Sequence, residues 1–399
     1  MLEHIVLHQL SEQISRVLTL NQHGFRNGLS CTTQLITVFH DLASNYDKGL
    51  ETHAVALDFS KAFDLVPHSV LIRKLIHCNI NPVLVHWIHA FLTNRYQRVV
   101  LHGCASSLVP VTSGVPQGSV LGPVLFLLFI NDITEVVKHC NIKLYADDTL
   151  LYRAVSSPGD CSLLQDDLNA LFQWSISNNM KFNASKSYVT VFSSKRRLNF
   201  ETSYCIGESV IQPVDCVKYL GVWMQGDLHW DTQISTIVTR ANRMLGLLRS
   251  TLTDAPSEIK KLAYTSLCRP LLEYASEVWD PYIKKHTHDL EIVQNRAVRF
   301  ILNIKGRDAS ITEAKDSIKL KTLATRRKEN RLKTLLNILD NEVLHPSLSN
   351  VLTEMLSKSS MSTRNQSLNP VYCRTNIFLN SFLPGTARDL RLGDEEVEL

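Results

Sequence analysis

The stretch that decides the fold is Ile142-Lys-Leu-Tyr-Ala-Asp-Asp-Thr-Leu-Leu-Tyr-Arg153. It contains two short apolar segments, 142–146 and 149–153, with only Asp147 and Asp148 between them. Two residues form the commonest loop of a β-hairpin, and aspartate tolerates such turns. The pattern therefore predicts a hairpin that carries two carboxylates at its tip.

A further carboxylate follows another predicted strand. Ala54-Val-Ala-Leu57 is short and continuously apolar, which is typical of a strand covered on both faces, and Asp58 comes directly after it. If both strands belong to one sheet, Asp58 and Asp147 converge. Close carboxylates repel one another unless a cation lies between them, and a pair of divalent ions is a standard device for phosphoryl displacement. The alternative is that Asp58 caps a turn and that Asp147 and Asp148 only form one.

The composition is that of a folded protein. The chain has 399 residues, of which 44% are apolar and 20% charged, so we expect two to three domains. Its nine cysteines are widely spaced, which excludes CxxC zinc sites and predicts no disulfide partner. No secretory signal precedes Glu12, so we expect an intracellular protein. The longest apolar run, 120–130, predicts a buried helix and no membrane partner, because a bilayer span needs ~20 such residues.

The net charge of +4 is unevenly distributed. Between Arg296 and Lys333, twelve Lys and Arg stand against four Asp and Glu, so this segment carries +8 and the rest of the chain −4. Such a bias predicts a polyanionic partner, although a solvated helix face would give the same count.

The remaining periodicity predicts mixed helices and strands up to about residue 230 and long helices from there to about 339. The segments expected before residue 180 are helices at 1–20, from Thr32, at 69–93 with a break at Pro82, and at 163–172 with Asp160 as N-cap, and a hairpin of 97–101 with 108–111. The last sixty residues show little periodicity.

Three strings resemble, in this order, the central motifs of reverse transcriptases. They are Ala56-Leu-Asp58-Phe-Ser-Lys-Ala-Phe-Asp64, Ser113-Gly-Val-Pro-Gln-Gly-Ser-Val-Leu-Gly-Pro123 and Leu144-Tyr-Ala-Asp-Asp148. Flanking motifs of the family are similar to Gln22-His-Gly-Phe-Arg26 with Ser30-Cys-Thr-Thr-Gln34, to Asn183-Ala-Ser-Lys186 and to Tyr219-Leu-Gly-Val222. Their order and spacing are most similar to non-LTR retrotransposon polymerases of the jockey type. The resemblance covers nearly the whole chain and includes a thumb-like segment, 269–279.

The resemblance implies an α/β (α+β) right-hand polymerase palm with partial fingers, followed by an all-helical thumb. The implied divisions are partial fingers at 1–52, a palm at 53–195 with an interleaved fingers segment at about 69–112, the end of the palm with a primer-grip hairpin at 196–230, a basic helical thumb at 231–340 and an irregular tail at 341–399.

The resemblance also implies a metal site. Asp58 and Asp147 would be the main ligands of two Mg²⁺ ions, for which Mn²⁺ could substitute, and Asp148 would support them. The backbone carbonyl of Phe59 would complete a shell of hard oxygens. Phe63 matches the aromatic residue that excludes a 2′-hydroxyl, although a core aromatic would show the same spacing.

Further contacts are implied by matched motifs. The nucleotide-binding set is Phe59, Phe63, Gln117, Gly118 and Arg26. Lys186 would lie near the pyrophosphate and could supply a proton, or it is a surface lysine. The primer grip would be Tyr219, Leu220 and Gly221, and the phosphate contacts would be Arg296, Arg299, Arg326, Arg327 and Lys328. Asp64, Pro67 and His68 are assigned to helix initiation.

The implied activity is RNA-directed DNA synthesis, with an RNA template, a DNA primer and deoxynucleoside triphosphates as partners. One alternative is an inactive relic that still binds RNA and DNA. Another, an RNA-dependent RNA polymerase, is disfavoured by Phe63 and by the Tyr-Ala-Asp-Asp string. In this family a fingers strand precedes a segment like Leu2–Val6, so we expect an amino-terminally truncated chain that extends primers weakly or not at all by itself.

Overall fold

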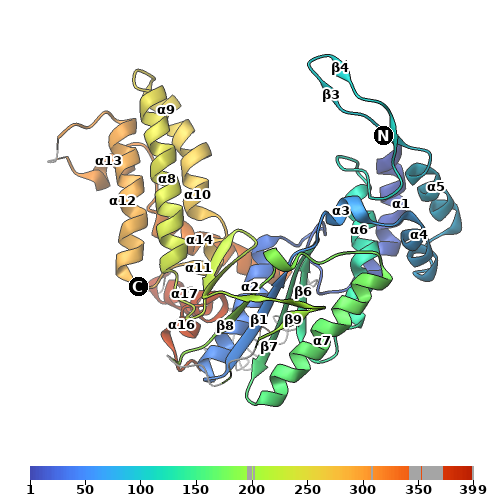
Figure 1. Cartoon of the computed structure of the whole chain (residues 1–399). Coiled ribbons are helices and arrows are strands. Elements are labelled where there is room, and N and C mark those ends of the chain that lie inside the picture. The colour runs from blue at the N-terminus through green and yellow to red at the C-terminus, as the bar shows by residue number, and fades with distance from the viewer. Residues whose placement is uncertain (196–199, 201–202, 307–308, 341–351, 353–371, 398–399) are drawn as a thin grey trace. The chain divides into compact units, whose positions relative to one another are not determined.

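The computed structural model describes the chain except for residues 196–199, 201–202, 307–308, 341–351, 353–371 and 398–399 (Figure 1). The chain divides into two compact units. The first comprises 1–34, 51–191 and 195–215, and the second comprises 35–50, 192–194 and 216–399. Neither unit is continuous in sequence, so the two units do not test the continuous divisions expected above. Those divisions remain predictions.

A five-stranded sheet lies at the centre of the first unit (Figure 1). In sheet order, its strands are β11 (Gln212–Pro213), β8 (Tyr188–Phe192), β1 (Glu51–Leu57), β7 (Asp148–Val155) and β6 (Asn141–Tyr145). β1 pairs antiparallel with β7 over its whole length, and Leu57 lies opposite Thr149. This register brings the end of β1 and the tip of the β6–β7 hairpin to the same end of the sheet.

The predicted hairpin is confirmed, with its turn shifted by one residue. Tyr145 pairs with Asp148, so the two turn residues are Ala146 and Asp147, and Asp148 begins β7. Ala146 has a φ of 55°, in the left-handed region. β1 is confirmed as a strand that is buried along nearly all of its length, as its continuous apolar run predicts.

The helices of the first unit lie close to their predicted positions. They are α1 (Leu2–Val17), α3 (Ala62–Leu65), α4 (His68–His77), α5 (Pro82–Leu92), α6 (Gly122–Ile130) and α7 (Pro158–Ser177). α6 is the predicted buried helix, and Pro123 lies in its first turn, where the missing N–H costs nothing. Asp160 is not the N-cap of α7. The N-cap is Ser157, and Asp160 completes a capping box with it.

Short strand pairs complete the first unit. The predicted hairpin before residue 112 consists of β2 (Tyr96–Gln97) with β5 (Val109–Pro110), and β3 (Val100–Leu101) with β4 (Cys104–Ala105). β9 (Cys205–Ile206) and β10 (Ser209–Val210) form another pair.

The second unit is mainly helical, as predicted for the region after residue 230. Most of α2 (Cys31–Asp47) and the hairpin of β12 (Cys216–Tyr219) and β13 (Val222–Gln225) belong to it. The helices that follow are α8 (Asp231–Thr251), α9 (Ser257–Ala263), a π-helical turn (Tyr264–Cys268), α10 (Arg269–Glu273), α11 (Ser276–Trp279), α12 (Lys284–Ile301), α13 (Ile311–Ser317) and α14 (Leu323–Asp340).

The prediction of an irregular tail is wrong for the part of the tail from residue 376 onward. α16 (Asn376–Leu379) and α17 (Phe382–Val397) lie there. Arg331 of α14 pairs with Asp389 of α17, so tertiary contacts support a helix that has a proline and a glycine in its first turn. Among the described residues, no helix is long and apolar enough to cross a membrane.

Candidate functional site

Three carboxylates meet at one end of the sheet. Asp58 follows β1, Asp147 lies in the hairpin turn, and Asp148 begins β7. Desolvation by the surrounding chain raises the pKa of Asp147, and repulsion from Asp58 adds to it. Desolvation, with repulsion from Asp147 and Asp58, raises the pKa of Asp148 to about 6. Desolvation is the larger cause of both shifts, and a cation would relieve the smaller part that comes from repulsion between the carboxylates.

The oxygen atoms at this end of the sheet are of the kind that binds a divalent ion together with substrate oxygens. Within the described ranges, no group of three or more His, Cys, Asp or Glu side chains is arranged so that it could hold a metal ion by itself. The backbone carbonyl of Asp58 accepts a hydrogen bond from the N–H of Asn183 at 2.7 Å. The N–H of Ser60 donates to the backbone carbonyl of Lys181. In this pairing the carbonyl of Phe59 points away from residues 181–183. Carboxylates and a carbonyl are hard oxygen donors, and Mg²⁺ usually takes only one or two carboxylates beside substrate phosphates.

The segment that contains Lys186 lies against Asp58. The hydroxyl of Ser187 donates to the carbonyl of Asn183 at 2.9 Å and accepts from the N–H of Asp58 at 3.3 Å. Lys186 ends the short 3-10 turn between these two residues, and its side chain is exposed. The segment is thus next to the carboxylates, while the proton transfer assigned to Lys186 stays a prediction.

Phe63 is held between two other rings. Its ring stacks on Phe126 of α6, with centroids 4.3 Å apart, and Phe25 contacts it edge-on at 6.2 Å. Phe63 is half-buried, so part of its side chain remains accessible to solvent. The steric-gate role stays a prediction, but the ring has a defined position from which to act.

The loop before α6 is bonded to the segment after Asp58. Val115 N–H donates to the carbonyl of Phe63 at 2.9 Å, and the side-chain amide of Gln117 donates to the Asp64 carboxylate at 2.8 Å. Asp64 therefore orients Gln117, a role that its assignment to helix initiation missed. No local spacing could have indicated this pair, because 53 residues separate the two. Gly118 has a φ of 78° and open space around it, so conformation rather than close approach requires glycine there.

Arg26 supports its own turn. Its Nη1 donates to the carbonyls of Thr19 at 2.6 Å and Gln22 at 3.2 Å, and burial lowers its pKa. These contacts give Arg26 a structural role, and its contact with the nucleotide stays a prediction.

The predicted hairpin at 219–221 is present in the second unit. Tyr219 pairs with Val222, and the two turn residues Leu220 and Gly221 both have positive φ, as a type I′ turn requires. The hydroxyl of Tyr274 donates to the carbonyl of Leu220 at 2.9 Å. The hairpin is therefore fixed at its tip, and its contact with a primer stays a prediction.

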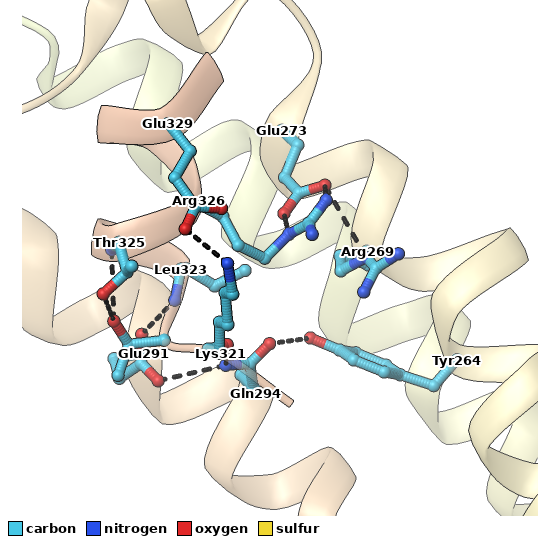
Figure 2. Close-up of polar contacts among 11 residues, drawn as sticks. Tyr264, Arg269, Glu273, Glu291, Gln294, Lys321, Leu323, Thr325, Arg326 and Glu329 are labelled. Atoms are coloured by element: carbon cyan, nitrogen blue, oxygen red, sulfur yellow. Dashed lines mark hydrogen bonds and ion pairs between the residues drawn. The ribbon is translucent and has the colours of Figure 1, made fainter. Parts of the chain in front are cut away.

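Part of the basic segment is neutralised by acids from elsewhere in the chain (Figure 2). Arg326 forms two hydrogen bonds with Glu273, whose carboxylate also lies 3.6 Å from Arg269. Arg327 is 1% exposed and pairs with Asp280 at 2.6 Å. The assignment of Arg327 to phosphate binding is wrong, because a buried, paired guanidinium cannot reach a phosphate.

Other cations of the second unit do face solvent. Arg296 is exposed, and its guanidinium donates to Asn242 at 3.0 Å. Arg299 and Lys328 are half-buried, and Arg299 donates to the carbonyl of Gly306 at 2.6 Å. The exposed arginines of α8, which the sequence analysis did not single out, are Arg240, Arg243 and Arg249. The absence of any Asp or Glu between Thr232 and Thr253 could have indicated them.

Residues 1–224 match the family model described as reverse transcriptase (RNA-dependent DNA polymerase). The chain is 30% identical over 323 residues to the RNA-directed DNA polymerase from mobile element jockey of Drosophila melanogaster, an alignment covering 75% of this chain and 34% of that protein. Identity to the probable RNA-directed DNA polymerase from transposon X-element, also of Drosophila melanogaster, is 27%, covering 70% of this chain and 32% of the relative. The chain thus spans about a third of the length of these relatives.

Among solved structures, apo telomerase from Candida tropicalis aligns with a TM-score of 0.44 and 11% sequence identity. The alignment covers 84% of this chain and 53% of the telomerase chain.

Proposed function

Because the chain belongs to the reverse transcriptase (RNA-dependent DNA polymerase) family, we propose that it is the polymerase part of a non-LTR retrotransposon protein. In this proposal it joins deoxynucleotides to the 3′-hydroxyl of a DNA primer on an RNA template. The observation that supports it best is the meeting of Asp58, Asp147 and Asp148 at one end of a sheet. Their mutual repulsion, which contributes to the raised pKa values of Asp147 and Asp148, fits a site for divalent ions.

Asp58 and Asp147 would hold Mg²⁺, or Mn²⁺ in its place, with the carbonyl of Phe59 and with Asp148 nearby. When bound, two such ions lower the pKa of the attacking hydroxyl and stabilise the leaving oxygens. The protein contributes position, because the sheet register fixes Asp58 opposite the hairpin that carries the other two carboxylates.

Gln117 and Phe63 would select the nucleotide. A carboxylate only accepts hydrogen bonds, so the amide nitrogen of Gln117 faces Asp64 and its oxygen would serve as the acceptor for a nucleotide. Phe63 would occupy the space of a 2′-hydroxyl, from a position fixed by Phe25 and Phe126. Lys186, exposed beside Asp58, would lie near the leaving pyrophosphate.

The exposed arginines would bind nucleic acid phosphates in a sequence-independent way. This set is Arg240, Arg243, Arg249 and Arg296. Arg326 and Arg327 are not in it, since Glu273 and Asp280 neutralise them. The hairpin at 219–221 would contact the primer.

Primer extension on an RNA template tests the proposal. With Mg²⁺ and all four deoxynucleotides the primer should lengthen, at most at the weak rate expected above for this chain by itself, and with ribonucleotides it should lengthen far less. Omission of the template should abolish extension, which separates templated synthesis from terminal addition. Equal use of both sugars would favour an RNA polymerase, and RNA binding without extension would favour an inactive relic.

A further inference from the structure

A buried glutamine contacts the turn that carries Asp147. The side-chain oxygen of Gln22 accepts from the N–H of Ala146 at 2.8 Å, and its side-chain nitrogen donates to the carbonyl of Ala146 at 3.2 Å. The side chain of Gln22 thus makes to Ala146 the same pair of hydrogen bonds that a residue of a neighbouring strand would make.

The backbone around Gln22 continues this pairing along β6. His23 N–H donates to the carbonyl of Leu144 at 3.0 Å, and Leu144 N–H donates to the carbonyl of Asn21 at 2.9 Å. These bonds place Gln22 beside Leu144 in a parallel bridge. The side chain of Gln22 therefore extends the ladder past the end of β6, to the point where the hairpin turns.

The turn depends on outside support. Ala146 has a φ of 55°, a conformation that residues with a Cβ rarely adopt. Gln22 is 1% exposed and Ala146 5%, so water cannot replace their hydrogen bonds. A Cβ on Gly24 would lie 2.4 Å from the nitrogen of Ala146, so the close approach requires glycine at that position.

We infer that Gln22 is a positioning residue that fixes the direction in which Asp147 leaves its turn. The catalytic consequence rests on the proposed function. Because phosphoryl transfer depends on precise placement of the reacting groups, a loosened turn should lower turnover more than nucleic acid affinity or nucleotide KM.

The test compares Gln22→Met, which keeps the length of the side chain but removes its hydrogen bonds, with Gln13→Met. Gln13 likewise accepts from a distant backbone N–H, that of Asn81 at 3.0 Å, but it does not touch the hairpin turn. Hydrogen exchange of the Ala146 amide should be about tenfold faster in Gln22→Met. The kcat of primer extension should fall about tenfold or more and half-activation should need more Mg²⁺, with RNA affinity unchanged. Gln13→Met should change none of these.

Gly24→Ala perturbs the same turn without removing a hydrogen-bonding group, so it should have the same effects as Gln22→Met. It serves as the test variant if Gln22→Met folds poorly. Unchanged exchange at Ala146 in both variants would overturn the inference. Fast exchange at Ala146 in Gln22→Met, together with a kcat and a Mg²⁺ dependence equal to those of Gln13→Met, would also overturn it. If the parent extends no primer, the proposed function fails, while the exchange measurement still decides whether Gln22 holds the turn.

Discussion

Arg327 should contribute to stability rather than to nucleic acid binding. Its guanidinium is 1% exposed and lies 2.6 Å from Asp280, whose side chain is 15% exposed. Removing one partner of a buried ion pair costs about 3–5 kcal/mol, because the other charge stays buried without compensation. Arg331 lies 3.2 Å from the same carboxylate and would still neutralise it. We therefore expect Arg327→Ala to cost about 3 kcal/mol, the low end of that range.

Asp280→Asn should cost more, because it leaves Arg327 without its partner while Arg331 keeps Asp389. Urea unfolding followed by circular dichroism measures both losses, and Lys333→Ala, an exposed change on the same helix, is the control. The same samples are titrated with salt in an RNA-binding assay. The reasoning is refuted if Arg327→Ala is as stable as Lys333→Ala and has a flatter dependence of affinity on salt.

Three further outcomes are expected. Arg240→Ala and Arg243→Ala should each reduce the slope of log affinity against log salt by up to about 0.7 on single-stranded RNA, and an unchanged slope would exclude a phosphate contact. Phe63→Val should raise ribonucleotide incorporation relative to deoxynucleotide incorporation in single-nucleotide extension, and unchanged discrimination would leave it a core residue. The Arg153 guanidinium holds the pKa of Asp160 well below its usual value, so this carboxylate stabilises the fold above its unfolded pKa of about 3.9 and less as pH falls below it. Asp160→Asn should therefore lose less stability between pH 7 and pH 3, measured by unfolding midpoints, than the parent does.

The sheet and its carboxylates could be predicted because their determinants are local. One strand and its end are specified by the apolar run before Asp58. The hairpin is specified by the two apolar runs on either side of Asp147, and each of these patterns extends over about ten residues. The turn was misplaced by one residue because its conformation depends on Gln22, which is 124 residues away. Propensity favours aspartate in such a turn, but the residue in the left-handed position is Ala146, whose N–H and carbonyl are both hydrogen-bonded to Gln22.

The errors in the helical region have the same origin. A count of charges from Arg296 to Lys333 cannot include Glu273 and Asp280, which precede that segment and neutralise two of its arginines. The tail shows little periodicity as a whole, yet α17 forms within it and packs against α14. Contacts between distant segments are not encoded in local patterns, so this part of the structure could not be derived from spacing alone.

The central claim is that Asp58 and Asp147 form one catalytic pair. The most direct measurement is single-turnover primer extension on an RNA template by the parent, Asp58→Asn, Asp147→Asn and Asp166→Asn, with RNA affinity measured in parallel. Asp166 is an exposed acid on α7 and serves as the matched control. Loss of a charged ligand removes several kcal/mol of transition-state stabilisation, so the two site variants should lose extension by about a thousandfold or more. They should bind RNA as the parent does, and Asp166→Asn should resemble the parent in both assays. Extension by Asp58→Asn or Asp147→Asn at the rate of Asp166→Asn would contradict the account.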